Sequence, residues 1–135
     1  MRLIWRQRLG RPECPYMTRW VLDLGWFAIR LHHWVASDDQ RNPHDHPFWY
    51  ITFILWGGYQ DKSPSGDTRM HVGKVACRRA SHQHTVLVDR GGCWSLLLTG
   101  PETREWGFWV GGKFRRRNKY FFEHGHHPCE ASPRA

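Results

Sequence analysis

The histidines that could do chemistry in this sequence are grouped in two His-x-His pairs. His44 and His46 lie within Pro43–Pro47, and His82 and His84 follow further along the chain. Side chains alternate between the two sides of an extended chain, so both histidines of a pair point the same way. Imidazole nitrogens are common ligands of divalent transition metals. We therefore predict that His44, His46 and a histidine of the second pair, His82 or His84, bind one such ion.

The elements that position these histidines are predicted to be β-strands. Phe48–Trp56 is apolar on both alternating faces, which is typical of a strand buried on both sides, and Gly57-Gly58 is predicted to turn the chain. Many short strands separated by turn residues, without a helical period, predict a sandwich or a barrel. The other predicted strands are Trp20–Leu24, Trp26–Val35, Thr68–Val72, Lys74–Cys77, Thr85–Val88, Cys93–Thr99 and Thr103–Val110.

The 135 residues are expected to form one domain around a single core. Residues 1–18 are basic and interrupted by two prolines, which predicts an arm outside the core. Residues 19–112 are predicted to form the β-barrel, and residues 113–135 a basic, histidine-rich extension. The extension contains a group that would suit zinc, although a polar tail with fortuitous histidines is the competing interpretation: His124, His126, His127 and Cys129.

The charge of the chain favours an anionic partner. Twenty basic and twelve acidic residues give a formal net charge of +8, which suits small phosphorylated or carboxylated molecules, nucleic acid or an acidic protein. Arg30 and His32 share one face of their predicted strand. If that face lines the interior, Arg30 would orient an anionic substrate. The basic segment Lys113–Lys119 precedes two aromatic residues and could instead bind nucleic acid, or be only a solvated face.

The sequence contains no membrane or secretion signal that we can identify. No apolar run approaches the ~18 residues of a membrane span, and the start of the chain lacks the apolar core of a signal peptide. The four cysteines are scattered without a C-x-x-C pair, which favours reduced thiols. A cytoplasmic protein without a membrane partner is therefore expected.

The histidine pairs resemble the two motifs of the cupin superfamily, Gly-x5-His-x-His-x3,4-Glu-x6-Gly and Pro-x-Gly-x2-His-x3-Asn. His44, His46 and Gly57 or Gly58 match the first motif, and His84 matches the second. The match departs at the glutamate of the first motif, where this chain has Tyr50 or Ile51, and at the proline and glycine of the second, where it has Arg79 and Ser81.

Three further segments resemble a group of small cupin-like proteins of bacteria and phages. They are Ser37–Pro47, which ends in His-Asp-His-Pro, Gly57–Tyr59 and Arg104–Phe108. In the first of them, Asp38, Asp39 and Arg41 are predicted to form an ion pair that braces the His44 loop, the alternative being a solvated loop. The resemblance implies an all-β fold, a small single-domain jelly-roll barrel, and a homodimer.

The resemblance also suggests a reaction. A three-histidine centre is similar to that of cupin thiol and diketone dioxygenases, so Fe(II) is the expected ion, with zinc, nickel or manganese as alternatives. Such a centre leaves positions open for substrate and dioxygen. Tyr50, at the vacated glutamate position, is predicted to be a phenol donor or else only a residue lining the barrel. His82 is predicted to be a fourth ligand, a base behind His84, or a residue at the rim.

These residues are compatible with three functions. The first is a non-haem Fe(II)-type oxygenase acting on a small anionic molecule. The second is a metal-free sugar-nucleotide isomerase or epimerase, with a barrel histidine as base and Tyr50 as acid. The third is a non-catalytic module that binds a small ligand or nucleic acid.

Overall fold

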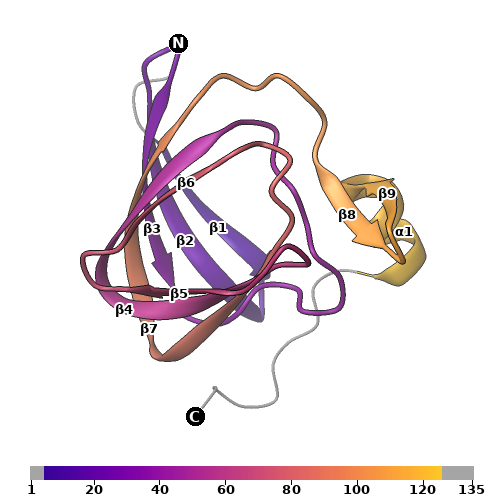
Figure 1. Cartoon of the computed structure of the whole chain (residues 1–135), viewed down its shortest axis with the longest axis horizontal. Helices are drawn as coiled ribbons and strands as arrows, with labels where there is room; N and C mark the ends of the chain where they lie inside the picture. The colour runs from indigo at the N-terminus through magenta and orange to yellow at the C-terminus, as the bar shows by residue number, and fades with distance from the viewer. Residues whose placement is uncertain (1–4, 126–135) are drawn as a thin grey trace.

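The computed structural model describes residues 5–125 as an antiparallel sheet that curls around an interior, with a small hairpin and a helix beside it (Figure 1). The order of strands in the sheet is β1-β2-β3-β7-β4-β5, and β6 also pairs with β4. This confirms the all-β, jelly-roll type of fold. The strands of the sheet are β1 (Trp5–Arg11), β2 (Cys14–Asp23), β3 (Ala28–Trp34), β4 (Tyr50–Lys62), β5 (Thr68–His71), β6 (Val75–Arg78) and β7 (Thr85–Thr99).

The curvature of the sheet comes from a bend shared by its two longest strands. β4 and β7 pair over most of their length, with register shifts at Ile54/Trp56 and Gly57/Tyr59. Gly57 and Gly92 both have positive φ, and a Cβ on Gly57 would overlap the carbonyl oxygen of Gly92. Only glycine, which lacks a Cβ, allows the backbones of β4 and β7 to come this close. The predicted turn at Gly57-Gly58 is therefore wrong, because β4 bends there and continues to Lys62.

The predicted N-terminal arm is wrong for residues 5–18. β1 pairs with β2 along its whole length, and Met17 of β2 is only 4% exposed within the core cluster. Pro12 lies in the turn that joins the two strands. The proline thus marks a hairpin of the sheet rather than a free segment.

The prediction that both faces of Phe48–Trp56 are buried is wrong for the isolated chain. Ile54 points into the core and is fully buried. On the opposite face, Phe53 is 39% exposed and Leu55 is similarly exposed. The strand is therefore apolar on its outer side without being covered there by this chain.

The boundary predicted at residue 112 falls inside a hairpin and is also wrong. β8 (Gly107–Val110) pairs with β9 (Lys113–Arg116) across Gly111-Gly112, and α1 (Arg117–His124) follows directly. Tyr120 of α1 is fully buried and stacks on Phe108 of β8, with ring centroids 3.9 Å apart. The helix therefore belongs to the domain. His126, His127 and Cys129 lie outside the described residues, so the zinc interpretation stays a prediction.

Two observations bear on location. No helix within residues 5–125 is long and apolar enough to cross a membrane. Cys77 and Cys93 are free thiols, but Cys14 is disulfide-bonded, so the prediction of reduced cysteines is wrong for Cys14. Since disulfides persist mainly in oxidising compartments, this counts against the cytoplasmic location, which stays a prediction.

Candidate metal centre

The two histidine segments meet through the backbone. His44 and His84 form an isolated antiparallel bridge, in which the N–H of each donates to the carbonyl of the other at 2.9 and 3.0 Å. The backbone N–H of His46 donates to the carbonyl of Ala80 at 3.0 Å. Hydrogen bonds between backbones therefore set the distance between the two motifs before any side chain is considered.

Asp45 points away from the two histidines that flank it, as alternation predicts. Its Oδ1 accepts the Gly107 backbone N–H at 2.9 Å, and its Oδ2 accepts the Trp109 indole N–H at 3.0 Å. Arg104 forms an ion pair with the same oxygen at 2.9 Å. Asp45 therefore fastens the histidine loop to the β8 hairpin.

The side chains of His44, His46 and His84 converge on one point. Their ring centroids lie 4.8 to 5.1 Å apart, and one nitrogen from each ring lies within 4.8 Å of the others. Burial lowers the pKa of all three imidazoles, so they are neutral at physiological pH and offer lone pairs. Nδ1 of His46 is buried without a hydrogen-bond partner. Neutral imidazoles with an unsatisfied buried nitrogen fit a divalent transition metal.

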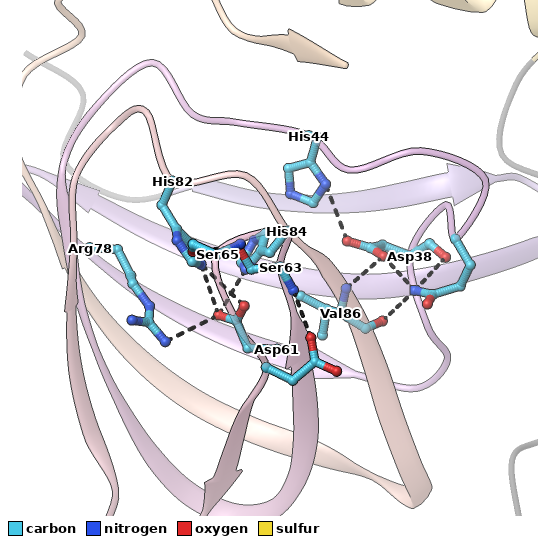
Figure 2. Close-up of polar contacts among 11 residues, drawn as sticks. Asp38, His44, Asp61, Ser63, Ser65, Arg78, His82, His84 and Val86 are labelled. Carbon is cyan, nitrogen blue, oxygen red and sulfur yellow. Dashed lines mark hydrogen bonds and ion pairs between the residues drawn. The ribbon is translucent and has the colours of Figure 1, made fainter. Parts of the chain in front are cut away.

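A carboxylate stands behind two of the three imidazoles (Figure 2). Nδ1 of His84 lies 2.9 Å from Oδ2 of Asp61, and Nδ1 of His44 lies 3.4 Å from Oδ2 of Asp38. Because a carboxylate can only accept, Nδ1 of His84 carries the hydrogen and Nε2 is left as the ligand atom. Carboxylates in this position orient metal-binding histidines and raise their basicity.

The two carboxylates differ in their charge environment. Burial alone would raise the pKa of Asp61, but hydrogen bonds from His82 and His84 hold it below its ordinary value. Burial raises the pKa of Asp38 well above its ordinary value, against a hydrogen bond from the Val86 backbone N–H at 2.9 Å. Asp61 is therefore the anionic member of the pair in the absence of a cation.

Sequence reasoning did not identify Asp61 and gave Asp38 a different role. The predicted brace is confirmed for Asp39, whose carboxylate accepts two hydrogen bonds from the Arg41 guanidinium at 2.9 and 2.7 Å. Asp38 instead faces His44. The sequence feature that points to Asp61 is its position two residues after Tyr59. Both side chains then lie on the same side of β4, which continues past Gly57-Gly58.

His82 belongs to a neighbouring group rather than to the convergent three. Its Nε2 lies 3.1 Å from Oδ1 of Asp61, and its ring centroid lies 5.0 Å from that of His84. Asp61, His82 and His84 are themselves close enough to hold a cation. The Arg78 guanidinium lies 3.6 Å from Asp61, however, and its positive charge disfavours a second metal there (Figure 2).

The three converging histidines line a cavity of about 860 Å³ inside the curled sheet. Tyr50 lies beside them, with its ring centroid 4.7 Å from that of His46. Its hydroxyl is buried without a hydrogen-bond partner, and burial raises its pKa well above the ordinary value. The phenol therefore stays protonated and can donate a hydrogen bond. His82 does not line this cavity but a smaller one of about 350 Å³, so it is not brought to Tyr50.

Arg30 and His32 also line the larger cavity, which confirms that their face of β3 points inward. The Arg30 Nε–H donates to Oγ1 of Thr99 at 3.1 Å, and the guanidinium lies 4.7 Å from the centroid of the Phe48 ring. Burial lowers the pKa of Arg30 to about 10, so it remains charged. Burial lowers the pKa of His32 to about 3, and its Nε2 has no hydrogen-bond partner.

Another part of the cavity wall is apolar and aromatic. It is formed by Met17, Trp34, Tyr59 and Val86. Arg117 and Phe121 of α1 also contribute to the lining, a role that sequence reasoning missed because the helix is short and weakly patterned.

Comparisons with known proteins identify the fold. No protein-family model matches the chain, and no curated protein matches its sequence. Among solved structures, the chain is similar to the polyketide cyclase RemF from Streptomyces resistomycificus, with a TM-score of 0.64 and 14% identity over 89% of this chain and 87% of that one.

Two other solved structures are similar. A cupin-2 domain protein from Rhodospirillum rubrum gives a TM-score of 0.61 at 11% identity, over 88% of this chain and 80% of that one. The Fe(II) form of HppE gives a TM-score of 0.59 at 9% identity, over 71% of this chain and 56% of that one. At such identities the likeness concerns the fold.

Proposed function

Since this chain has the cupin fold and gathers three histidines inside it, we propose that it is a metal-dependent enzyme that oxidises a small anionic molecule. His44, His46 and His84 would hold the ion. The observation that carries the proposal is their convergence, with a buried and unsatisfied Nδ1 on His46. The Fe(II) state of HppE, a structure of similar fold, supports Fe(II) as the ion. When bound, Fe(II) would supply redox chemistry with dioxygen.

The residues around the centre would bind and orient the substrate. The charged guanidinium of Arg30 would attract a carboxylate or a phosphate into the cavity. The phenol of Tyr50 would donate a hydrogen bond to a substrate oxygen close to His46. The apolar part of the wall, which includes Trp34 and Tyr59, would hold a hydrophobic or aromatic part of the same molecule. The expected substrate is thus a small anion with an apolar body.

The metal-free isomerase or epimerase remains the second candidate because Tyr50 and His46 are neighbours. A protonated phenol and a neutral imidazole with ring centroids 4.7 Å apart form a plausible acid and base for proton transfer. This function would survive complete removal of metal by a chelator, whereas the proposed oxidation would not. Activity measured before and after chelation therefore separates the two.

A binding module for nucleic acid is less well supported. Arg115 lies 3.7 Å from Glu123, Arg116 lies 2.9 Å from Glu105, and the Arg117 guanidinium packs over the ring of Trp106. These contacts occupy much of the basic segment that would bind phosphates. Salt-dependent retention on nucleic acid would revive this alternative.

Oxygen uptake tests the proposed function. The protein should be purified without a histidine tag, loaded with Fe(II) under nitrogen, and mixed with oxygen and a panel of aromatic or aliphatic carboxylates and phosphates. We expect uptake with at least one anion, and none with its neutral amide or ester. Arg30→Gln should raise KM for that anion, whereas Arg8→Gln on the exposed side of β1 should not. Equal uptake with charged and neutral compounds would contradict the role of Arg30.

A further inference from the structure

The smaller cavity, of about 350 Å³, lies beside the metal centre and shares no lining residue with the larger one. Its walls come from the β4–β5 loop, the end of β6 and the segment that joins β6 to β7. Within residues 5–125, the lining includes no carboxylate and no Trp, Tyr or Phe. Its guanidinium, hydroxyl and imidazole groups belong to Arg78, Arg79, Ser63, Ser65, Ser81 and His82. We call this cavity the arginine pocket.

The charge of the arginine pocket favours an anion. Arg78 and Arg79 are consecutive, and both guanidinium groups contribute to the lining. The planar fork of N–H donors on a guanidinium matches the oxygens of a carboxylate or a phosphate. The nearest acid, Asp61, is buried and is not part of the lining. An anion that enters the pocket therefore meets two positive charges and no exposed carboxylate.

Arg78 has unused hydrogen-bond donors. Its Nε and Nη2 are buried and form no hydrogen bond with any described residue, and Nη2 lies 3.6 Å from Oδ2 of Asp61, beyond hydrogen-bond distance (Figure 2). Asp61 does not depend on this contact, because His84 and His82 already bond to its two oxygens at 2.9 and 3.1 Å. The Arg78 side chain is 21% exposed. It can therefore turn towards an anion in the pocket without breaking a hydrogen bond, and the anion would satisfy donors that are otherwise costly to bury.

The two loops that form the walls are held in place by backbone hydrogen bonds. The His82 N–H donates to the carbonyl of Arg79 at 3.0 Å, and the His46 N–H donates to the carbonyl of Ala80 at 3.0 Å. In the β4–β5 loop the Gly66 N–H donates to the carbonyl of Ser63 at 3.0 Å. The pocket is therefore formed before a ligand enters, which lowers the entropy lost on binding.

We propose that the arginine pocket binds a small sugar phosphate, at a site separate from the metal centre. Arg78 and Arg79 would hold the phosphate group. The hydroxyl groups of Ser63, Ser65 and Ser81 would bind the hydroxyl groups of the sugar. The volume is near the lower end of the ~300–1,000 Å³ of small-molecule sites and is larger than a phosphate group alone needs. The inference does not depend on the proposed oxidation, because none of the lining residues is one of the three converging histidines.

The lining favours a sugar phosphate over the other phosphate-containing ligands. Proteins that bind single-stranded nucleic acid stack its bases on aromatic side chains, and the described lining has no Trp, Tyr or Phe. The larger cavity differs in the same respect, since Trp34 and Tyr59 line it beside Arg30. The two cavities are therefore suited to different anions, one with an apolar body and one with a polar body.

Isothermal titration calorimetry tests the proposal on metal-free protein from which the chelator has been dialysed away. Ribose 5-phosphate should bind the wild type more tightly than inorganic phosphate does, and ribose should not bind. Arg78→Gln and Arg79→Gln should each weaken the binding by about tenfold or more. Arg79 is exposed, so its variant should fold normally even if the Arg78 variant does not. Arg8→Gln removes the same charge from the exposed side of β1 and should change the affinity by less than about twofold.

Chemical modification locates the ligand without any variant. Phenylglyoxal reacts with guanidinium groups, and mass spectrometry of the peptides should show that ribose 5-phosphate slows the modification of Arg78 and Arg79 but not of Arg8. No binding of ribose 5-phosphate, or equal affinity in the wild type and Arg79→Gln without protection, would overturn the proposal.

The remaining outcomes would assign the phosphate elsewhere. Loss of binding in Arg30→Gln, with Arg79→Gln unchanged, would place it in the larger cavity. Inorganic phosphate that bound as tightly as ribose 5-phosphate would contradict a role for the sugar. A short single-stranded DNA that displaced ribose 5-phosphate at an equal concentration of phosphate groups would favour nucleic acid over the proposed ligand.

Discussion

His44 and His84 face each other across a two-residue antiparallel bridge, with reciprocal backbone hydrogen bonds of 2.9 and 3.0 Å. The two proposed ligands come from different segments, yet their spacing is set by the backbone and not by a metal. Asp61 then orients His84 through a hydrogen bond to its Nδ1, and Oδ2 of Asp38 lies 3.4 Å from Nδ1 of His44. The site is therefore assembled by the fold itself, and metal binding should require little rearrangement.

Asp61 is expected to strengthen metal binding through His84. Asp61→Asn removes the negative charge and leaves one acceptor oxygen where two imidazoles now bind. Loss of such a carboxylate costs roughly 10- to 100-fold in metal affinity. Competition with a chromogenic chelator measures this, and Asp67→Asn in the β4–β5 loop serves as the control. Equal affinity in the wild type and both variants would reduce Asp61 to a structural role.

Tyr50 occupies the position at which a carboxylate would complete the centre. Because its ring lies 4.7 Å from that of His46, Tyr50→Glu should place a negative charge near the ion and raise metal affinity by about tenfold or more. Tyr50→Gln, of the same length but neutral, should not. The glutamate variant should also lose oxygen uptake, since it fills a position that the substrate needs. If Tyr50→Glu binds metal no better than Tyr50→Gln, residue 50 does not face the ion.

Met17 tests whether β2 belongs to the core. It is buried in the main core cluster, to which Trp34 and Tyr59 also belong, so Met17→Ala should reduce the free energy of unfolding by about 2–5 kcal/mol. Arg8→Ala, at an exposed position of β1, should change it by less than about 0.5 kcal/mol. Urea titrations at equal protein concentration provide both values. A loss below about 1 kcal/mol for Met17→Ala would return this segment to the role of an arm.

His32 should make folding sensitive to acid. Burial lowers its pKa to about 3, so the native protein keeps it neutral while the unfolded chain takes up a proton below about pH 6.5. Stability should therefore fall as the pH drops from about 6.5 towards 3, by up to about 1.4 kcal/mol per pH unit from this group. In the presence of a chelator, the slope of unfolding free energy against pH should be shallower for His32→Leu than for wild type. Identical slopes would mean that His32 is protonated in the native state.

The part of the site that could be predicted from the sequence depends on alternation alone. The i, i+2 spacing of His44 and His46, the second histidine pair, and the place of Tyr50 on the same side of its strand are local properties. The structure brings His44, His46, His84 and Tyr50 to one cavity, whereas His82 lines the smaller one. Asp61 could not be found in this way, because two glycines that usually end a strand instead bend β4 through a close approach to Gly92. That approach depends on pairing with β7 and is not visible in local sequence.

The errors at the two ends of the chain have similar causes. By local preference Pro12 predicts a break in an arm, but it lies in the turn of a hairpin whose second strand carries the buried Met17. The helix α1 has little pattern of its own and is held by the stacking of Tyr120 on Phe108. In both places tertiary packing, rather than local preference, decides the structure.

Metal content measured on protein purified without a histidine tag tests the central claim most directly. After reconstitution with Fe(II), manganese, nickel or zinc and removal of excess ion, the wild type should retain about one ion per chain. His44→Ala and His84→Ala should retain much less. His71→Ala, which changes an exposed histidine outside the cavity, should match the wild type. Equal metal in all four proteins, or none in the wild type with any of the four ions, would contradict the proposed metal centre.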